Sequence, residues 1–105
     1  MNHVKQGDII ELSRSSMQAL VLSRDFFNRT GLAVLCPIEK TASEDALHFP
    51  INTKHIKGVA LCEHLKTVDL KTRFYKTISS LTIEQLQDIC DAVQDIFAFY
   101  PFSIF

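Results

Sequence analysis

Two short apolar runs separated by a turn-rich connector constrain this chain more than any other feature. The first run is Ala19–Leu22 and the second is Leu32–Cys36. Both have the length of a strand, are too short for typical helices and lack polar alternation, which is typical of central strands. Residues 28–31 supply side chains that tolerate positive φ in a turn, and Phe26 and Phe27 are expected to cover the core. The pattern predicts an antiparallel pair at the centre of a sheet.

Four more short segments have the apolar content or the alternation of strands, and they are residues 9–12, 47–51, 58–62 and 65–68. Pro37 has no N–H to donate, so we expect it to stop the hydrogen-bond ladder of the second central strand. The polar residues 39–45 are expected to form a surface loop. Residues 69–75 are expected to turn out of the sheet.

One amphipathic helix is predicted near the end of the chain. Thr82 and Gln85 have the spacing of a capping box, and Leu81 and Leu86 stand in the positions of a hydrophobic staple. A stripe of apolar side chains then recurs at helical spacing: Leu86, Ile89, Cys90, Val93 and Phe97. The opposite side carries the acidic residues Glu84, Asp88, Asp91 and Asp95, which are expected to be a solvated face.

Length and composition place the chain among ordinary globular proteins. Its 105 residues suit one domain, and 47% hydrophobic with 22% charged residues is far from the composition of a disordered chain. No segment approaches the roughly 18 apolar residues that a membrane span needs, so a cytoplasmic protein is expected. Cys36, Cys62 and Cys90 are odd in number and lie among aliphatic residues, which favours buried thiols over disulfides or zinc ligands.

Charge and aromatic residues are unevenly distributed along the chain. Residues 54–76 hold six Lys or Arg against two acids, whereas residues 82–105 hold four acids and no base. Such asymmetry gives one face that attracts phosphates, although two differing solvated surfaces would give the same pattern. Five aromatic residues crowd the end of the chain: Phe97, Phe99, Tyr100, Phe102 and Phe105. They are expected to pack on the domain itself or at a dimer or partner interface.

An ordered set of landmarks resembles the MazF/PemK family of growth-inhibitor toxins. The landmarks are Gly7-Asp8-Ile9, residues 19–23, Phe27-Asn28 with Thr30-Gly31, Cys36-Pro37-Ile38, residues 58–61 and residues 68–73. The resemblance implies a mainly β (α+β) fold, a small SH3-like barrel of the MazF/PemK/CcdB type with a C-terminal α-helix. The single domain would span residues 1–105, with the barrel over about 6–70, the helix over about 82–98 and an aromatic tail at 99–105.

Members of this family cut single-stranded RNA without metal or cofactor, by attack of a 2′-hydroxyl on the adjacent phosphate. The resemblance therefore implies a type II toxin that is a homodimer and is blocked by a cognate antitoxin protein. The family usually carries an arginine in an Arg-Pro-Ala stretch and a Thr or Ser after Cys-Pro-Ile. The aligned residues here are Met17 and Glu39, and both changes oppose the familiar chemistry, because neither side chain can stabilise an anionic transition state.

A rearranged site is one way to reconcile the resemblance with these changes. The candidates for catalysis are Arg14, Glu39, Thr41 and His64, and the candidates for RNA binding are Lys40, Lys66, Lys71 and Arg73. His48, His55 and His64 lack the tight spacing of metal ligands, so no metal site is predicted. The alternative is a catalytically inactive protein of the same fold that binds a protein or nucleic acid, since folds commonly outlive their chemistry.

Overall fold

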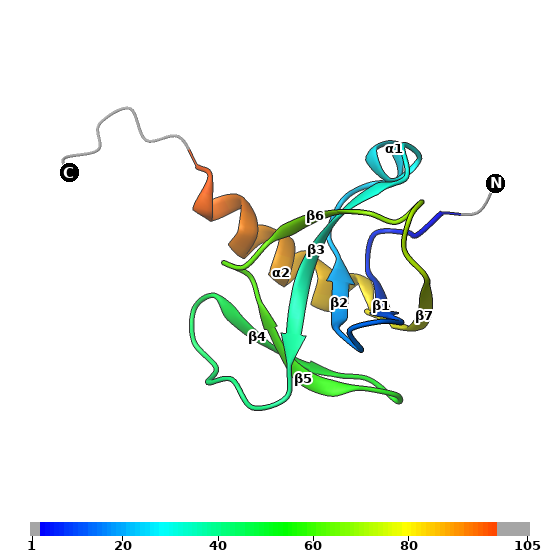
Figure 1. The fold of residues 1–105 in the computed structure, drawn as a ribbon. Helices are drawn as coiled ribbons and strands as arrows, with labels where there is room; N and C mark the ends of the chain where they lie inside the picture. The colour runs from blue at the N-terminus through cyan, green and yellow to red at the C-terminus, as the bar shows by residue number, and fades with distance from the viewer. Residues whose placement is uncertain (1–2, 99–105) are drawn as a thin grey trace.

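The computed structural model describes residues 3–98, so the aromatic tail predicted at 99–105 lies outside the described residues. The elements follow one another as β1 (Asp8–Leu12), β2 (Gln18–Val21), α1 (Asp25–Asn28), β3 (Leu32–Glu39), β4 (His48–Asn52), β5 (Lys57–Leu61), β6 (Lys66–Asp69), β7 (Tyr75–Ser80) and α2 (Ile83–Ile96). The antiparallel sheet curls into a half-barrel, with α2 across one side of it (Figure 1). The predicted mainly β fold with a C-terminal helix is confirmed.

Strands far apart in the sequence meet in this sheet. Its strand order is β4-β5-β3-β2-β1-β7, and β6 pairs with β3 beside this path. The predicted antiparallel pairing of β2 with β3 is confirmed. The expectation that residues 69–75 turn out of the sheet holds for residues 70–74, which connect β6 to β7. The sequence interpretation missed β7, which pairs with β1 from Asp8 to Leu12. The sheet therefore extends to Ser80, beyond the boundary near residue 70 predicted for the barrel.

Strand β3 continues past Pro37, contrary to the prediction from the missing N–H. Pro37 pairs with Ala19 of β2, and the strand ends only at Glu39. The amide of Leu22 donates to the carbonyl of Val34 at 3.0 Å. Alternation along the strand then turns the nitrogen of Pro37 away from β2. On that other side β3 changes partner, from β6 up to Leu35 to β5 from Ile38 onward, so a missing donor costs little there.

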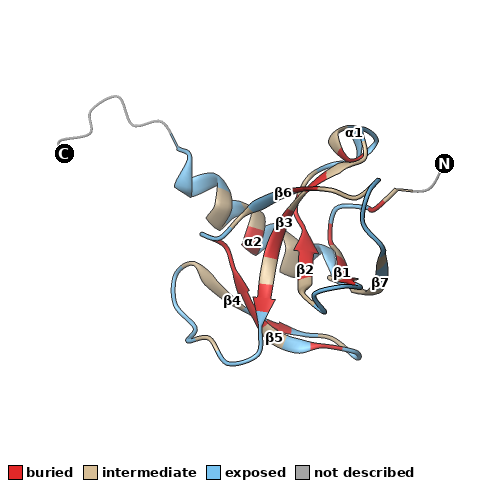
Figure 2. Ribbon diagram, in the orientation of Figure 1, coloured by how far each residue is buried: buried red, intermediate tan, exposed pale blue. Residues whose placement is uncertain are grey.

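The two faces of the sheet are both buried, which explains why the central strands are continuously apolar. One core cluster lies under α2 and includes Ile9, Leu20, Cys36 and Ile38. The other lies on the opposite face, with the following members: Val4, Ile10, Leu12, Ala19, Val21, Ala33, Leu35 and Val68. Figure 2 shows the buried positions concentrated along β1, β2, β3 and β5. We call the first face the helix face and the second the open face.

The connector between β2 and β3 contains the short helix α1 and one buried polar residue, Asn28. The Asn28 amide donates to the carbonyls of Val4 at 3.2 Å and Ser23 at 2.9 Å. Its carbonyl accepts from the Ser23 hydroxyl at 2.5 Å. Asn28 is therefore more than a turn residue, because it joins the start of the chain to the end of β2. Phe26 is 69% exposed, so the expectation that it covers the core is wrong.

Helix α2 has the capping box that the sequence predicts at Thr82 and Gln85. Ile89 is buried, and Leu81, Leu86, Cys90 and Val93 pack against the cluster on the helix face. Phe97, which the helical stripe places in the core, is instead 72% exposed, because the last turn runs past the sheet (Figure 1). Neither helix described in residues 3–98 has the length and apolar character needed to cross a membrane.

We expect the substitution Thr82→Ala to lower the free energy of unfolding by about 1 kcal/mol, because the Gln85 amide loses its acceptor. Urea denaturation followed by circular dichroism measures this loss. Gln87→Ala, at an exposed position of the same helix, is the matched control. A loss for Thr82→Ala no larger than that of the control would contradict the role of the capping box.

Candidate functional site

The curled sheet brings together the two stretches that the family resemblance singles out. Gln18, at the start of β2, pairs with Ile38, near the end of β3. Continuing this register places Met17 opposite Glu39. Met17 packs on the open-face cluster, whereas Ile38 belongs to the helix face, so alternation turns Glu39 to the open face as well. The two positions that differ from the family therefore lie side by side on one face.

The turn before β2 carries Arg14 and is held by backbone hydrogen bonds. The Ser16 amide donates to the Leu12 carbonyl at 2.9 Å, and Ser16 adopts a positive φ of 55°. The Ser13 amide donates to the Phe74 carbonyl at 3.0 Å. This last bond joins the β1–β2 turn to the segment between β6 and β7. It is the contact that brings Arg14 near a second arginine.

Arg14 and Arg73 line one surface cavity of about 490 Å³. The remaining lining residues are Leu12, Ser15, Thr72 and Phe74. Leu12 belongs to the open-face cluster, so the cavity lies on the same face as Met17 and Glu39. The side chain of Phe74 is 79% exposed. Two guanidinium groups, two hydroxyls and an open aromatic ring form a set suited to a phosphate and an adjoining base. We call these six residues the arginine cavity.

A second basic cavity is lined by other residues of the segment 70–75. It has a volume of about 430 Å³, and its lining includes Arg29, Gly31, Lys71 and Tyr75. Lys71 and Arg73, two predicted RNA-binding residues, thus project from one short connection into neighbouring cavities. Gly31 has a φ of 92°, and a Cβ there would lie 2.4 Å from Cγ of Lys71. This close approach holds the lysine stem against the end of α1.

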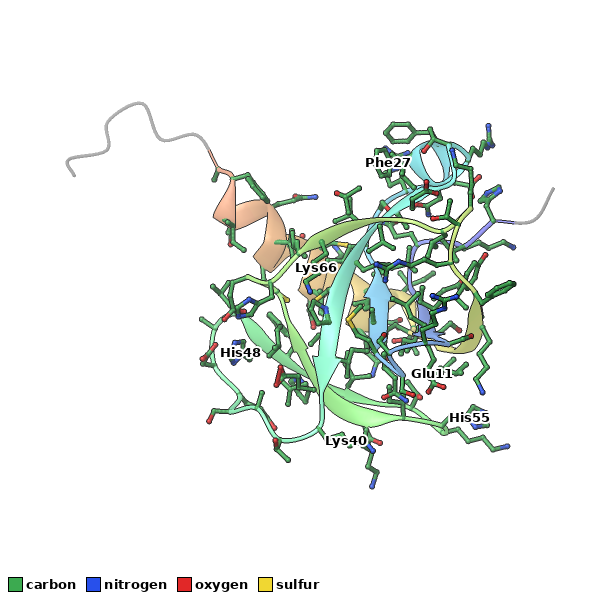
Figure 3. The ribbon with its side chains drawn as sticks, viewed as in Figure 1. Glu11, Phe27, Lys40, His48, His55 and Lys66 are labelled. Atoms are coloured by element: carbon green, nitrogen blue, oxygen red, sulfur yellow. The ribbon has the colours of Figure 1, made fainter. Side chains whose placement is uncertain are left out.

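The other predicted residues lie outside the arginine cavity. Thr41 and Lys40 are exposed in the loop after β3, and Lys66 is exposed on β6 opposite Leu35. Lys40 and Lys66 lie well apart in Figure 3. His64 is exposed in the bend between β5 and β6. Arg14 and Arg73 thus line the same cavity, and Glu39 lies on the same face of the sheet, the open face. Thr41 and His64 do not line the arginine cavity.

A polar row that the sequence did not reveal crosses β2, β1 and β7. Gln18 donates to Glu11 at 3.2 Å, and the Lys76 ammonium lies 3.9 Å from the other Glu11 oxygen. The registers place both partners directly opposite Glu11, which Figure 3 labels. The sequence gives little indication of this row, because finding it requires knowing that β7 pairs with β1. The row lies on the opposite face from Leu12, and so on the opposite face from the arginine cavity. We therefore assign it a role in strand pairing.

Hydrogen bonds of the His48 side chain connect the loop before β4 to the bend after β5. The Nε2 atom of His48 lies 2.7 Å from a Glu63 oxygen, and its Nδ1 lies 2.7 Å from the Ser43 carbonyl and 3.4 Å from Asp45. The hydrogen bond with Glu63 raises the pKa of His48. Its own backbone N–H, and then His48, lower the pKa of Glu63. His55 lies at the opposite end of the β4–β5 hairpin (Figure 3). Within residues 3–98, no group of three or more His, Cys, Asp and Glu side chains is placed to hold a metal ion.

The pair of His48 and Glu63 predicts a pH dependence of stability. Because the folded pKa of His48 is raised, its contribution is present below the unfolded value of about 6.5 and is lost as the pH rises through the folded pKa. The folded pKa of Glu63 is lowered, so its contribution is present above about 4.3 and is lost as the pH falls. We therefore expect His48→Gln to destabilise the protein more near pH 5.5 than near pH 9.

Urea denaturation of both proteins at the two pH values measures this difference. His55→Gln, at an exposed turn, is the control for loss of an imidazole. An equal loss of stability at both pH values would show that the ion pair contributes nothing.

The comparisons with known proteins agree with this architecture. A model of the family described as PemK-like, MazF-like toxins of type II toxin–antitoxin systems matches residues 5–97. The crystal structure of a MazE–MazF complex from Deinococcus radiodurans superposes with a TM-score of 0.83 at 21% identity, covering 92% of this chain and 98% of that one. An endoribonuclease in complex with its cognate antitoxin, from a mycobacterial species, gives 0.79 at 14% identity, covering 93% and 99%. No curated protein is similar enough in sequence to match the chain.

Proposed function

The chain belongs to the family of PemK-like, MazF-like toxins of type II toxin–antitoxin systems, and we propose that it acts on single-stranded RNA as a metal-independent endoribonuclease. The observation that carries the proposal is the arginine cavity. Arg14 and Arg73 are far apart in the sequence, yet they converge with Ser15 and Thr72 beside an exposed aromatic ring. The two arginines of this cavity are proposed to supply the positive charge that the family's arginine supplies at the position of Met17.

The arginine cavity suits an unpaired nucleotide. Guanidinium groups bind phosphate oxygens through paired N–H donors, and an exposed ring stacks on a base without demanding its identity. Phe74 supplies the ring in the arginine cavity. Lys71 and Arg29 in the second cavity would contact the next phosphate along the strand. Lys40 and Lys66 would add long-range attraction from other parts of the surface.

Cleavage requires a proton acceptor, a proton donor and positive charge at the developing phosphorane. We place Arg14 and Arg73 at the phosphate, where their charge offsets that of Glu39 as well as that of the phosphorane. Glu39 lies on the same face and is the proposed acceptor of the 2′-hydroxyl proton. Thr41 lies past the end of β3, whereas His64 lies in the bend between β5 and β6, beside the middle of β3. Neither lines the arginine cavity, and both are proposed to contact RNA only where it extends beyond that cavity. In this reaction the 2′-oxygen, which gives its proton to Glu39, bonds to phosphorus as the bond to the 5′-oxygen breaks, and the 5′-oxygen takes up a proton from water.

Incubation of the purified chain with mixed-sequence single-stranded RNA in EDTA tests this function. We expect cleavage that survives chelation and leaves 2′,3′-cyclic phosphate ends. A DNA strand of the same sequence is the matched control, because it lacks the 2′-hydroxyl and is expected to stay intact. RNA that stays intact at high protein concentration would contradict the proposed activity.

A second candidate is a non-catalytic protein of this fold that works through an interface. Two observations favour it: Met17 and Glu39 stand where the family carries its catalytic side chains, and an apolar cavity of about 350 Å³ lies between α1 and α2. Phe26 and Val93 line that cavity. RNA that is bound but not cut would support this candidate.

The partners proposed for the toxin are a second copy of the chain and a cognate antitoxin protein. A short neighbouring reading frame with an acidic tail or a DNA-binding segment would support the toxin–antitoxin pair. Sedimentation of the purified chain distinguishes a homodimer from a monomer. Because its proposed substrate is cellular RNA, the toxin is expected to act in the cytoplasm.

A further inference from the structure

Cys36 lies on β3, and Cys62 lies in the turn directly after β5, the strand that pairs with β3 from Ile38 onward. Strand β3 pairs with β5 through Ile38 with Ala60 and Glu39 with Val59. Continuing this register by two residues places Cys36 opposite Cys62. The Cys62 amide donates to the Leu47 carbonyl at 2.9 Å, so the chain still follows the sheet at this position. Both cysteines are completely buried and belong to the cluster on the helix face.

The geometry of this pair suits a covalent bond. The carbonyls and amides of even-numbered residues in β3 point toward β2, as the bond from the Leu22 amide to the Val34 carbonyl shows. Cys36 and Cys62 therefore form a pair of the non-hydrogen-bonded kind, whose Cα atoms lie about 4.5 Å apart. This distance falls at the short end of the range of about 4.4–6.8 Å found in disulfides. Both side chains point to the same face, because Ile38 and Ala60 belong to the same cluster.

The two thiols also influence each other's ionisation. The neighbouring Cys62 thiol, followed by burial, raises the pKa of Cys36, and the Cys36 thiol lowers the pKa of Cys62. The third cysteine, Cys90, lies on α2, is partly exposed and packs against the same cluster. Burial, then the neighbouring Asp91, raises the pKa of Cys90.

We propose that Cys36 and Cys62 form a reversible disulfide when the protein meets hydrogen peroxide. The Cys62 thiolate attacks one peroxide oxygen, the O–O bond breaks and a sulfenic acid forms. The departing hydroxide takes up the proton that the Cys62 thiol released and leaves as the first water. The Cys36 thiol then attacks that sulfur, an S–S bond forms, and the S–O bond breaks to release the second water. The two sulfurs together lose two electrons, which reduce the peroxide. The closed ring spans residues 36–62, so it encloses Glu39, Lys40 and Thr41.

Peptide mapping of the wild-type chain tests this proposal without any substitution. Trypsin places the three cysteines in separate peptides, which are Thr30–Lys40, Gly58–Lys66 and Thr77–Phe105. After treatment of the folded protein with hydrogen peroxide and alkylation, we expect most disulfide to join the first two peptides. Dithiothreitol is expected to restore the free thiols. In concentrated urea the register is lost, and the same treatment is expected to give all three pairings without this preference.

Two variants complete the test. Cys90→Ser is expected to keep the cross-link, because Cys90 takes no part in it. Cys62→Ala is expected to lose it and to show no replacement bond between Cys36 and Cys90. Cross-linking mainly of Thr77–Phe105 to either other peptide in the folded wild type would overturn the proposal. Oxidation confined to Cys90, or disulfides formed only between chains, would overturn it too.

Discussion

Replacing Arg14 with alanine is expected to lower the rate of RNA cleavage by about 100-fold to 1,000-fold, because a preorganised charge at the phosphorane is lost. Arg73→Ala is expected to weaken binding and to reduce the slope of log K against log salt by about 1. Single-turnover cleavage in EDTA measures the first effect, and fluorescence anisotropy with labelled RNA at several salt concentrations measures the second.

Arg24→Ala is the matched control for both variants. Arg24 is also exposed, but its guanidinium stacks over Phe26, 5.5 Å from the ring centroid, away from the arginine cavity. We expect this variant to cut RNA at nearly the wild-type rate. Equal losses in Arg14→Ala and Arg24→Ala would mean that net charge, rather than the arginine cavity, determines activity.

Replacing Asn28 with alanine is expected to lower the free energy of unfolding by about 2–4 kcal/mol. The substitution removes both amide donors, so the carbonyls of Val4 and Ser23 lose their partner in a buried region. It also leaves the Ser23 hydroxyl without its acceptor, although that hydroxyl still accepts from the Val34 amide at 2.9 Å. Loss of these hydrogen bonds is therefore expected to loosen the N-terminal segment, α1 and β3 together.

Urea denaturation followed by near-ultraviolet circular dichroism measures this loss. Asn52→Ala, at an exposed position at the end of β4, is the control for losing an asparagine. If both variants were equally stable, the Asn28 side chain would be contributing no more than a solvated turn residue.

Most of the fold is predictable from the sequence because its strongest local signals agree with the tertiary structure. The runs at 19–22 and 32–36 are apolar throughout because both sheet faces are buried there. The start of α2 is predictable because Thr82 and Gln85 form their bonds within one helical turn. These features depend on neighbours in the chain, so propensity and periodicity are sufficient to find them.

The errors occur where the outcome depends on distant partners. No residue of β7 is fully buried and the strand carries little apolar alternation, so only its pairing with β1 defines it. Pro37 is tolerated because β3 changes partner at that position, which no local rule predicts. Phe97 follows the helical stripe, yet the sheet beneath α2 ends before the helix does.

The sequence offers the residue types of the candidate site but not their grouping. Arg14 stands out by its charge in the loop before β2, and Arg73 by its charge and its place in a family landmark. Their meeting in one cavity depends on the bond between the Ser13 amide and the Phe74 carbonyl, which joins two irregular segments. Side chains in such segments have no sequence periodicity from which their direction can be deduced.

The most direct test of the RNA site is an NMR titration of the isotope-labelled chain with a short single-stranded RNA in EDTA. We predict that the largest amide shifts fall on Arg14, Ser15, Thr72 and Arg73 and that they vanish in Arg73→Ala. Shifts centred instead on the apolar cavity between α1 and α2, or no shifts at saturating RNA, would contradict the assignment of the arginine cavity as the RNA site.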